Sequence, residues 1–371
     1  MSLRHLLVTG PTRSGTTLVA RLLDTHPDVS VAAQPFPSVY VETAADFRAA
    51  RGLPRPAFPL GDLFLEERYR PEELDRFLAT YAPGEDRLAE IWRVMQRYSG
   101  RQTVVPLPAD APGASSFADL LARLHDAAAA RGVAVAGAKE VIVEEFLPYL
   151  IGCGFGGLLV IRDPRDVVAS TLAPGGGRWV GRPRPLLFIL RNWRRAVMVA
   201  AALDGTPGFA VIRFEDLVAD TADTLARLAE FLEVAPFPAD AGAAALGDWR
   251  GNSSFGEVGG ISPGAVGRHR VALDDTAVRY VETVCGPEMD WLGCHRVDRR
   301  DVAALADFAE PGPVRRDVDP RMSIAPERLA EETERLRLAA SGDATPDEQR
   351  RFFRFPAAYE RLSAAYREGT A

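Results

Sequence analysis

A glycine-containing turn near the start of the chain carries groups that bind anions. Its spacing is Gly10-x4-Gly15, and Arg13 is the cation within it. The apolar run 6–8 predicts a buried strand before the turn, and apolar residues at helical spacing predict a helix after it. N–H groups at a helix start, together with the helix dipole, attract negative charge. The turn is therefore a candidate anion site, to which three hydroxyl residues contribute: Ser14, Thr16 and Thr17.

A second candidate anion site lies in the segment Arg162-Asp163-Pro164-Arg165-Asp166-x3-Ser170. A buried strand ends at Arg162, and proline at the first helical position opens a helix. Ser170 lies about two turns into that helix, so a phosphate between the two residues would meet a guanidinium and a hydroxyl. The alternative is structural: Asp163 caps the helix, and Arg165 and Asp166 are solvated.

One lysine stands apart from the other basic residues. The chain has 44 lysine and arginine residues, of which only Lys139 is a lysine. Arginine is a wide planar fork and lysine a compact ammonium on a flexible stem. A single lysine therefore suggests a site that requires an ammonium, although the survival of one lysine by chance is the alternative.

Further strands are expected where apolar runs recur, and together they would place these groups at one edge of a sheet. The expected strands are residues 29–32, 133–139, 157–162 and 209–213. Helical stretches separate them, which predicts a parallel sheet with crossover helices. Ligands bind at the carboxyl ends of the strands in such sheets, where Gly10, Lys139 and Arg162 lie. The predicted fold class is α/β, a P-loop-like three-layer domain with a central parallel sheet.

Two helical regions accompany this domain, which we predict to span residues 1–295. A helical insertion covers about 40–130, with helices near 71 and 85 and at 116–130. Residues 296–371 form a helical C-terminal extension that packs on the domain or on a subunit neighbour. Its helices are expected at 326–338 and 346–366.

The composition of the chain limits the kinds of binding partner that it is expected to have. The chain has 371 residues, 47% of them hydrophobic, and a net charge of −7. This balance argues against nucleic acid and anionic membranes as partners. The start of the chain reads as no secretory signal and no apolar run is long enough to span a membrane, which predicts a cytoplasmic protein. The three cysteines are too few and too scattered to predict a metal site. In one alternative Cys285 and Cys294 form a disulfide. In the other, both of them and Cys153 are small buried hydrophobic residues.

The first motif differs at one position from the phosphate-binding loop of nucleoside triphosphatases. That loop has lysine directly after the second glycine, where this chain has Thr16. An ATP-dependent phosphotransferase is therefore the less favoured alternative. The run Pro11-x-Arg13-Ser14-Gly15-Thr16-Thr17-Leu18 instead resembles the 5′-phosphosulfate loop of sulfotransferases that use 3′-phosphoadenosine 5′-phosphosulfate (PAPS), with arginine as in the carbohydrate and protein-tyrosine branch. The inserted Thr12 is a small departure.

The second motif resembles the 3′-phosphate-binding segment of the same family. The resemblance implies that Arg162 and Ser170 hold the 3′-phosphate of PAPS, and that Arg13, Ser14, Gly15, Thr16 and Thr17 hold the phosphosulfate. Segment 213–218 resembles a structural part of the family, and segment 252–255 with Gly267-Arg268 a late loop over the nucleotide. Arg268 is a weaker substitute for the arginine-lysine-glycine triplet found there in the cytosolic branch. The resemblance covers roughly residues 4–295.

The resemblance also assigns chemistry to Lys139. Its ammonium would stabilise the negative charge that builds on the bridging oxygen of the leaving nucleotide, with Arg13 acting from the other side. No metal is needed for such an in-line transfer. The family's general bases are absent, because the matching positions hold Gln34 and Val141.

Candidates for the base are Glu140 and Glu42, while His26 reads as a structural helix end. A pre-ionised or amine acceptor would need less help from a base. The missing base also motivates a catalytically silent nucleotide-binding protein as a further alternative. The acceptor is a small molecule, sugar or natural product, with segment 174–185 bordering its pocket; a homodimer and a bacterial origin are further predictions.

Overall fold

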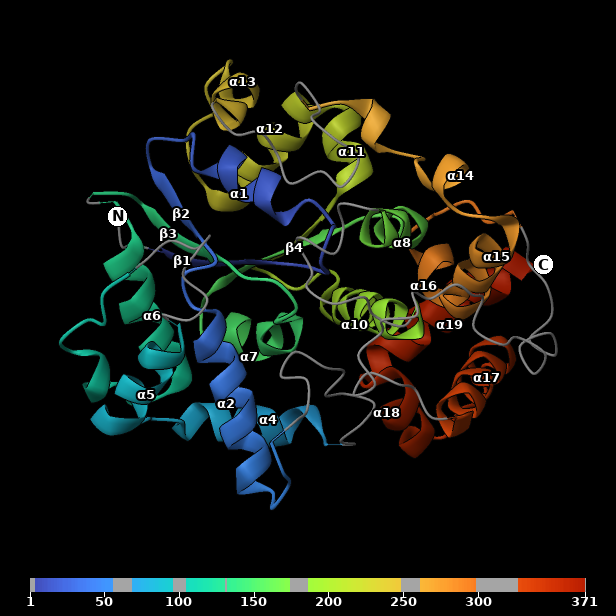
Figure 1. Cartoon of the computed structure of the whole chain (residues 1–371), viewed down its shortest axis with the longest axis horizontal. Coiled ribbons are helices and arrows are strands. Elements are labelled where there is room, and N and C mark those ends of the chain that lie inside the picture. Colours follow the sequence, from blue (N-terminus) through green and yellow to red (C-terminus); the bar gives the residue numbers. More distant parts are fainter. Residues whose placement is uncertain are drawn as a thin grey trace.

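The central feature of the molecule is one five-stranded parallel sheet (Figure 1). A computed structural model describes residues 4–55, 69–95, 105–130, 132–173, 186–247, 261–297 and 326–370. The strand order is β2-β3-β1-β4-β5, so β1 is the central strand and lies between β3 and β4. The strands are β1 (Arg4–Thr9), β2 (Val29–Ala33), β3 (Val135–Lys139), β4 (Gly156–Ile161) and β5 (Phe209–Arg213).

The sheet separates two hydrophobic cores. Successive side chains of a strand point to opposite faces, and β1 shows this: Leu6 and Val8 belong to one core and Leu7 to the other. The smaller core is closed by α1 (Thr16–Leu23), α11 (Phe214–Ala219), α12 (Thr221–Leu232) and α13 (Ala241–Leu246). Figure 1 shows these helices above the sheet and the larger set below it, which confirms the predicted three layers.

The larger core contains helices that follow β3, β4 and β5 in the chain. They are α7 (Leu147–Gly152), α8 (Pro164–Leu172), α10 (Leu186–Leu203), α15 (Asp275–Val284) and α16 (Gly286–Trp291). The side chain of Trp193 on α10 is completely buried there.

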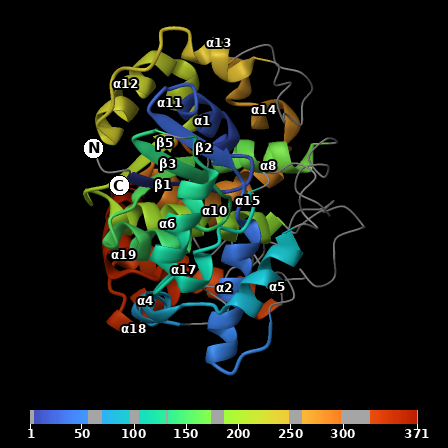
Figure 2. The ribbon, with the colours of Figure 1, turned by 90° about the vertical axis from the view of Figure 1, so that its left-hand side faces the viewer.

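The predicted insertion between β2 and β3 is helical. It contains α2 (Pro37–Ala50), α4 (Pro71–Thr80), α5 (Glu85–Met95) and α6 (Phe117–Ala128). Ser116 caps α6 by accepting a hydrogen bond from the N–H of Asp119. Figure 2 shows these helices beneath the sheet, where their apolar faces join the larger core.

The C-terminal extension packs on the domain, as one of the two predicted alternatives states. Its helices are α17 (Pro326–Ser341), α18 (Pro346–Phe353) and α19 (Pro356–Thr370), and α19 lies against α10 and α16. Buried ion pairs join the extension to those two helices: Arg194 pairs with Glu332, and Arg335 with Glu288 at 2.7 Å.

Several boundaries differ from the sequence prediction. The expected helix 346–366 is two helices, because Arg354 between them adopts a positive φ of 65°. After the predicted strand 209–213, two helices follow in direct succession, α11 and α12. The described part of the late segment that contains Gly267-Arg268 includes a short 3₁₀ turn (Pro263–Ala265) and α14 (His269–Ala272).

The described residues contain no helix long and apolar enough to cross a membrane. Among the same residues, no cluster of three or more histidine, cysteine or acidic side chains could hold a metal ion.

Candidate functional site: an anion site at the carboxyl edge of the sheet

The turn between β1 and α1 depends on its two glycines. Gly15 is the N-cap of α1 with a φ of 93°, a conformation that favours glycine. A Cβ atom at Gly15 would overlap the ring of Phe214, and one at Gly10 would overlap the carbonyl of Val160. The turn therefore packs tightly against its neighbours. The first N–H groups of α1, beginning at Thr16, have no carbonyl partner within the helix, so they remain available to an anion.

Two hydroxyl groups beside this turn are buried without a hydrogen-bond partner among the described residues. They are the Oγ1 of Thr9 at the end of β1 and the Oγ of Ser14 within the turn. A buried hydroxyl without a partner costs free energy. The oxygen atoms of a bound phosphate or sulfate would provide the missing partner for Ser14.

The second predicted motif meets the first directly. The guanidinium of Arg13 donates from Nε to the Oγ of Ser170 at 2.9 Å, and Arg162 donates to the carbonyl oxygen of Arg13 at 3.3 Å. Burial, and then the positive charge of Arg162, lowers the pKa of Arg13 to about 10. Three predicted anion-binding residues from separate elements therefore converge at one point.

The position of Arg162 is fixed from several sides. Trp193 of α10 donates its indole N–H to the carbonyl oxygen of Arg162 at 2.8 Å. The guanidinium lies 4.7 Å from the ring centre of Phe214 and 3.6 Å from the carboxylate of Asp166. Its Nε is buried and has no partner among the described residues. Burial lowers the pKa of Arg162, and the nearby carboxylates only partly offset this.

Asp166 ties the late loop to the second motif. Its buried carboxylate accepts hydrogen bonds from the N–H of Gly267 at 2.7 Å and from the N–H and Nδ1 of His269 at 2.9 and 2.8 Å. Arg268 lies between these two anchors, and its charge lowers the pKa of Arg162. The structure thus places Arg268 near the second motif, while segment 252–255 lies outside the described residues.

Arg165 and Asp166 are buried, so the alternative in which both are solvated is wrong. Arg165 pairs with Glu282 of α15 and with Asp163, each at 2.6 Å. Asp163 caps α8 by accepting from the N–H of Arg165, as that alternative expects. The N–H of Asp163 in turn donates to Glu215 at 2.8 Å, so segment 213–218 supports the second motif.

Lys139 ends β3 between β1 and β2, opposite Val8 and Ala33. It is 2% exposed, and its Nζ donates to the Oε1 of Gln34 at 2.9 Å. Burial lowers the pKa of Lys139, and the charge of Glu140 opposes this effect. An ammonium therefore lies at the same edge of the sheet as the turn after β1.

The candidate bases are held by other partners. Glu140 is buried and accepts a hydrogen bond from the N–H of Phe36 at 2.6 Å; burial raises its pKa. Glu42 pairs with Arg55 and Arg87. The role of Glu140 as a base stays a prediction.

Two structural expectations can be checked directly. His26 is buried, its Nδ1 accepts from the N–H of Asp28, and its Nε2 lies 2.9 Å from the carbonyl oxygen of Ala235, which confirms a structural role. All three cysteines are free, so the disulfide alternative is wrong. Cys285 and Cys294 are buried as expected, but Cys153 is exposed because it follows the end of α7 at the surface.

Sequence reasoning missed Trp193 as a support of Arg162 and Gln34 as the partner of Lys139. An indole N–H in a buried helix needs a hydrogen-bond partner, which was the available signal for Trp193. The sequence gave no such signal for Gln34, because its φ of 48° and its hydrogen bond to Lys139 on the neighbouring strand are visible only in the structure.

No family model matches the chain, and no curated protein matches it. Solved structures that resemble it include the sulfotransferase domain of the Synechococcus PCC 7002 olefin synthase, at 19% identity over 76% of this chain and 94% of that chain, with a TM-score of 0.41. The sulfotransferase domain of the curacin biosynthetic pathway has 14% identity over 77% and 99%, with a TM-score of 0.42. Retinol dehydratase in complex with retinol and PAP has 19% identity over 81% and 85%, with a TM-score of 0.37.

Proposed function

We propose that this chain is a sulfotransferase that transfers the sulfuryl group of PAPS to a hydroxyl or amine of a small molecule or carbohydrate. The contact between the two anion motifs supports this most directly. Arg13 of the first motif donates to Ser170 of the second, and Arg162 donates to Arg13. PAPS carries an anionic group on each side of its ribose, and a site built from two adjoining anion motifs suits such a molecule.

The unsatisfied groups of the site fit this ligand. The Oγ of Ser14 and the Nε of Arg162 are both buried without partners among the described residues. One belongs to the turn that would hold the phosphosulfate and the other to the motif that would hold the 3′-phosphate. Gly15, Thr16 and Thr17 would add the open N–H groups and hydroxyls of the start of α1, and Arg268 a further cation.

In the proposed reaction, an acceptor oxygen or nitrogen forms a bond to sulfur while the bond from sulfur to the bridging phosphate oxygen breaks. The acceptor's proton leaves, and the leaving nucleotide gains negative charge. Lys139 and Arg13 would stabilise that charge because both are cations at this edge of the sheet, Lys139 buried and Arg13 partly buried. Glu140 stays the proposed base, and a pre-ionised acceptor would not need it.

The finer predictions are part of the same proposal. The reaction would need no metal ion and would take place in the cytoplasm of a bacterium. Residues 1–295 would form the catalytic domain, with 296–371 as its extension. A homodimer stays a prediction.

Nucleotide binding tests the two motifs separately. We expect calorimetry to show tighter binding of adenosine 3′,5′-bisphosphate than of AMP. Arg162→Ala should weaken the bisphosphate by about tenfold to a hundredfold, the value of one or two hydrogen bonds to a charged group, and leave AMP nearly unchanged. Arg227→Ala is the matched control, because Arg227 lies exposed on α12 and pairs with Asp223. Equal affinity of the wild type for both nucleotides would refute the proposal.

Transfer is tested by incubating cell extract with PAPS and enzyme and measuring acceptors that gain the mass of a sulfuryl group. Lys139→Ala and Arg13→Ala should each reduce this transfer. Undiminished transfer by both variants would refute the roles given to them.

A catalytically silent nucleotide-binding protein is the second candidate. It is favoured by the hydrogen bonds of Gln34, which occupies the position of a general base, and of Glu140, the candidate base. Gln34 binds Lys139, and Glu140 binds the N–H of Phe36. This candidate predicts tight binding of adenosine 3′,5′-bisphosphate without transfer to any acceptor, so one positive acceptor would exclude it.

A further inference from the structure

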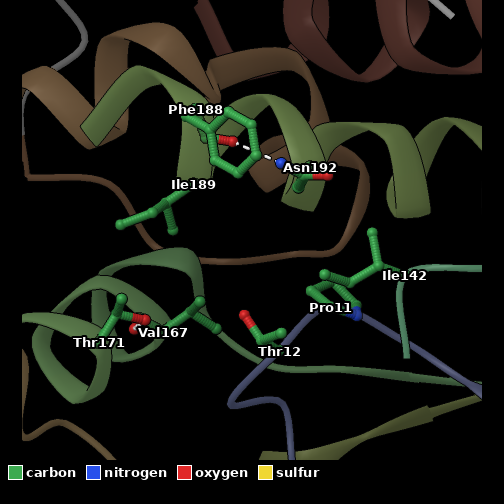
Figure 3. Close-up of a pocket in the computed structure, with 8 residues that line it drawn as sticks. All are labelled: Pro11, Thr12, Ile142, Val167, Thr171, Phe188, Ile189 and Asn192. Carbon is green, nitrogen blue, oxygen red and sulfur yellow. Dashed lines mark hydrogen bonds between the residues drawn. The ribbon is translucent and has the colours of Figure 1, made fainter. Parts of the chain in front are cut away.

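Two cavities in the described part of the molecule differ greatly in size. The cavity between the turn after β1 and helices α8 and α10 leaves about 10 Å³ for the centres of water-sized molecules, which is room for about one water (Figure 3). A cleft formed by α8, α14, α15 and the segment after α16 leaves about 620 Å³ by the same measure. That volume is typical of small-molecule sites, so of these two cavities the cleft, called the α15 cleft below, has room for an organic ligand.

The charged groups of the α15 cleft are not balanced. Arg165 and Glu282 pair with each other at 2.6 Å. Arg270 and Arg279 also line the cleft, and neither forms an ion pair with any residue that the structure describes. This holds even for Asp275, the remaining carboxylate of the lining, which lies one turn before Arg279 on α15. The cleft therefore has an excess of positive charge in a chain whose net charge is −7, which favours an anionic ligand.

His269 adds a further polar atom to the cleft. Its side chain is 9% exposed, and its Nδ1 lies 2.8 Å from the carboxylate of Asp166. Its Nε2 forms no hydrogen bond with the described residues. None of the described residues that we propose to bind PAPS lines this cleft, although Asp166 contacts both His269 and Arg162. The α15 cleft is therefore separate from the two anion motifs and offers an imidazole nitrogen to a second ligand.

An aliphatic wall completes the lining, formed by Leu273, Val278 and Val297. Val297 is 79% exposed, although its N–H is held by a hydrogen bond to the carboxylate of Glu282 at 2.9 Å. A ligand with an apolar body would remove this wall from water, which is favourable.

We propose that the α15 cleft is a second ligand site, which binds a small organic phosphate with an apolar body. The two guanidinium groups without carboxylate partners, Arg270 and Arg279, would bind the phosphate, because the arginine fork matches its oxygen atoms. A phosphate monoester carries nearly two negative charges at pH 7, so it suits two such cations better than a carboxylate does. The apolar body would lie on the aliphatic wall. This site goes beyond the proposed sulfuryl transfer and does not depend on it.

Histidine signals give a measurement specific to this cleft. Two of the five histidines of the chain, His269 and His295, line it. Full-length protein with ¹³Cε1-labelled histidine is titrated with phenyl phosphate at constant pH and ionic strength. We expect a saturable shift of the His295 signal, which the exposed-site variant His295→Gln identifies. The signals of His26 and His125, which lie at the end of α1 and on α6, should not move.

Three further probes test the chemistry of the ligand. Inorganic phosphate lacks the apolar body and should bind about tenfold more weakly than phenyl phosphate. Benzoate carries one negative charge and should bind about fivefold more weakly. Benzyl alcohol is neutral and should not shift the His295 signal at the same concentration.

Two variants test the cations. Arg270→Met and Arg279→Met keep an unbranched apolar side chain and should each weaken phenyl phosphate about fivefold. Neither side chain is buried, so the melting temperature should stay close to that of the wild type. Arg227→Met is the matched control, because Arg227 is exposed on α12 and pairs with Asp223.

The proposal is overturned if the His295 signal shows no saturable shift, if both arginine variants bind phenyl phosphate like the wild type, or if benzoate binds as tightly as phenyl phosphate. Weaker binding in Arg162→Ala but not in Arg279→Met would place the probe at the anion motifs and also overturn it. Adenosine 3′,5′-bisphosphate separates this site from the proposed function, because Arg279→Met should bind that nucleotide like the wild type. A wild type that binds phenyl phosphate but shows no preference for the bisphosphate over AMP would refute the proposed transfer and leave this site standing.

Discussion

Arginine side chains cluster in two regions of this molecule, and the two regions differ in whether carboxylates pair with the guanidinium groups. Around the middle of α10, buried arginines lie against buried carboxylates: Arg194 pairs with Glu332 and Arg335 with Glu288. At the carboxyl edge of the sheet, Arg13 donates to a hydroxyl, and Arg162 lies 3.6 Å from a carboxylate that is already bonded to Gly267 and His269.

The pKa values reflect this difference. The pKa of Arg194 is raised, because the charges of Glu332 and Glu288 outweigh the effect of burial. The pKa values of Arg13 and Arg162 are lowered by burial. The charge of Arg194 is balanced within the fold, whereas the lowered pKa values of Arg13 and Arg162 agree with the anionic ligand proposed above.

Removing the carboxylate of Glu332 should have the largest effect. Glu332→Ala leaves Arg194 buried without its ion-pair partner, which costs about 3–5 kcal/mol of unfolding free energy. Arg162→Met, at the anion site, should change the stability of the ligand-free protein by less than about 1 kcal/mol, because it removes a buried cation with an unpaired Nε. Urea denaturation at pH 7 measures both.

Glu334→Ala is the control within the same helix. Glu334 pairs with Arg337 at 2.9 Å near the surface, so its loss should cost less than about 0.5 kcal/mol. If Arg162→Met destabilised the protein as much as Glu332→Ala, the contrast between the two regions would be wrong.

The second prediction concerns acid. Burial alone would raise the pKa of Glu332, but the charges of Arg194 and Arg335 outweigh it and lower the pKa to about 2. A carboxylate with a depressed folded pKa stabilises the protein above its unfolded pKa, and this contribution is lost as pH falls toward the folded value. Between pH 6 and pH 3, the stability difference between the wild type and Glu332→Gln should shrink by about 2 kcal/mol.

Thermal or urea unfolding of both proteins across that pH range measures this difference, since other titrating groups contribute equally to both. A constant difference would mean that Glu332 is not held as a paired carboxylate. Glu334→Gln, at the surface, should show a much smaller change.

The candidate site at the carboxyl edge of the sheet was largely predictable from the sequence, because its residues belong to short local motifs. Glycine spacing predicted the turn at Gly10–Gly15, and the strand-to-helix pattern predicted the positions of Arg162 and Ser170. Parallel strands then bring these patterns to one edge. The contact of Arg13 with Ser170 was not predictable, because it depends on how the turn after β1 packs against the distant helix α8.

The charged network of the extension was not predictable for a related reason. Arg194 and Glu332 are 138 residues apart, and nothing local distinguishes them from the many exposed arginines and glutamates of the chain. The burial of Arg165 was missed likewise, because its partner Glu282 lies on a helix far along the chain. Long-range ion pairs leave no periodic signal in a sequence.

The smallest expected effect concerns Lys139 at the carboxyl edge of the sheet. Its hydrogen-bond partner Gln34 is neutral, whereas the buried arginines beside α10 pair with carboxylates. Because Gln34 is neutral, burial lowers the pKa of Lys139 from its usual value of 10.5. The ammonium is therefore lost at lower pH than usual, and any activity that needs it should fall earlier as pH rises. Gln34→Glu places a carboxylate beside the ammonium and should raise the pKa of Lys139 by about one unit or more.

The single lysine allows a direct measurement. Protein grown with ¹³Cε-labelled lysine gives one lysine signal, and its chemical shift against pH reports the ionisation of Lys139. The wild-type midpoint should lie below 10.5 and should move upward in Gln34→Glu, while Gln34→Met, which is also neutral, should leave it low. A wild-type midpoint at or above 10.5 would show that the edge already balances this charge, and the contrast with the Arg194–Glu332 region would then not extend to Lys139.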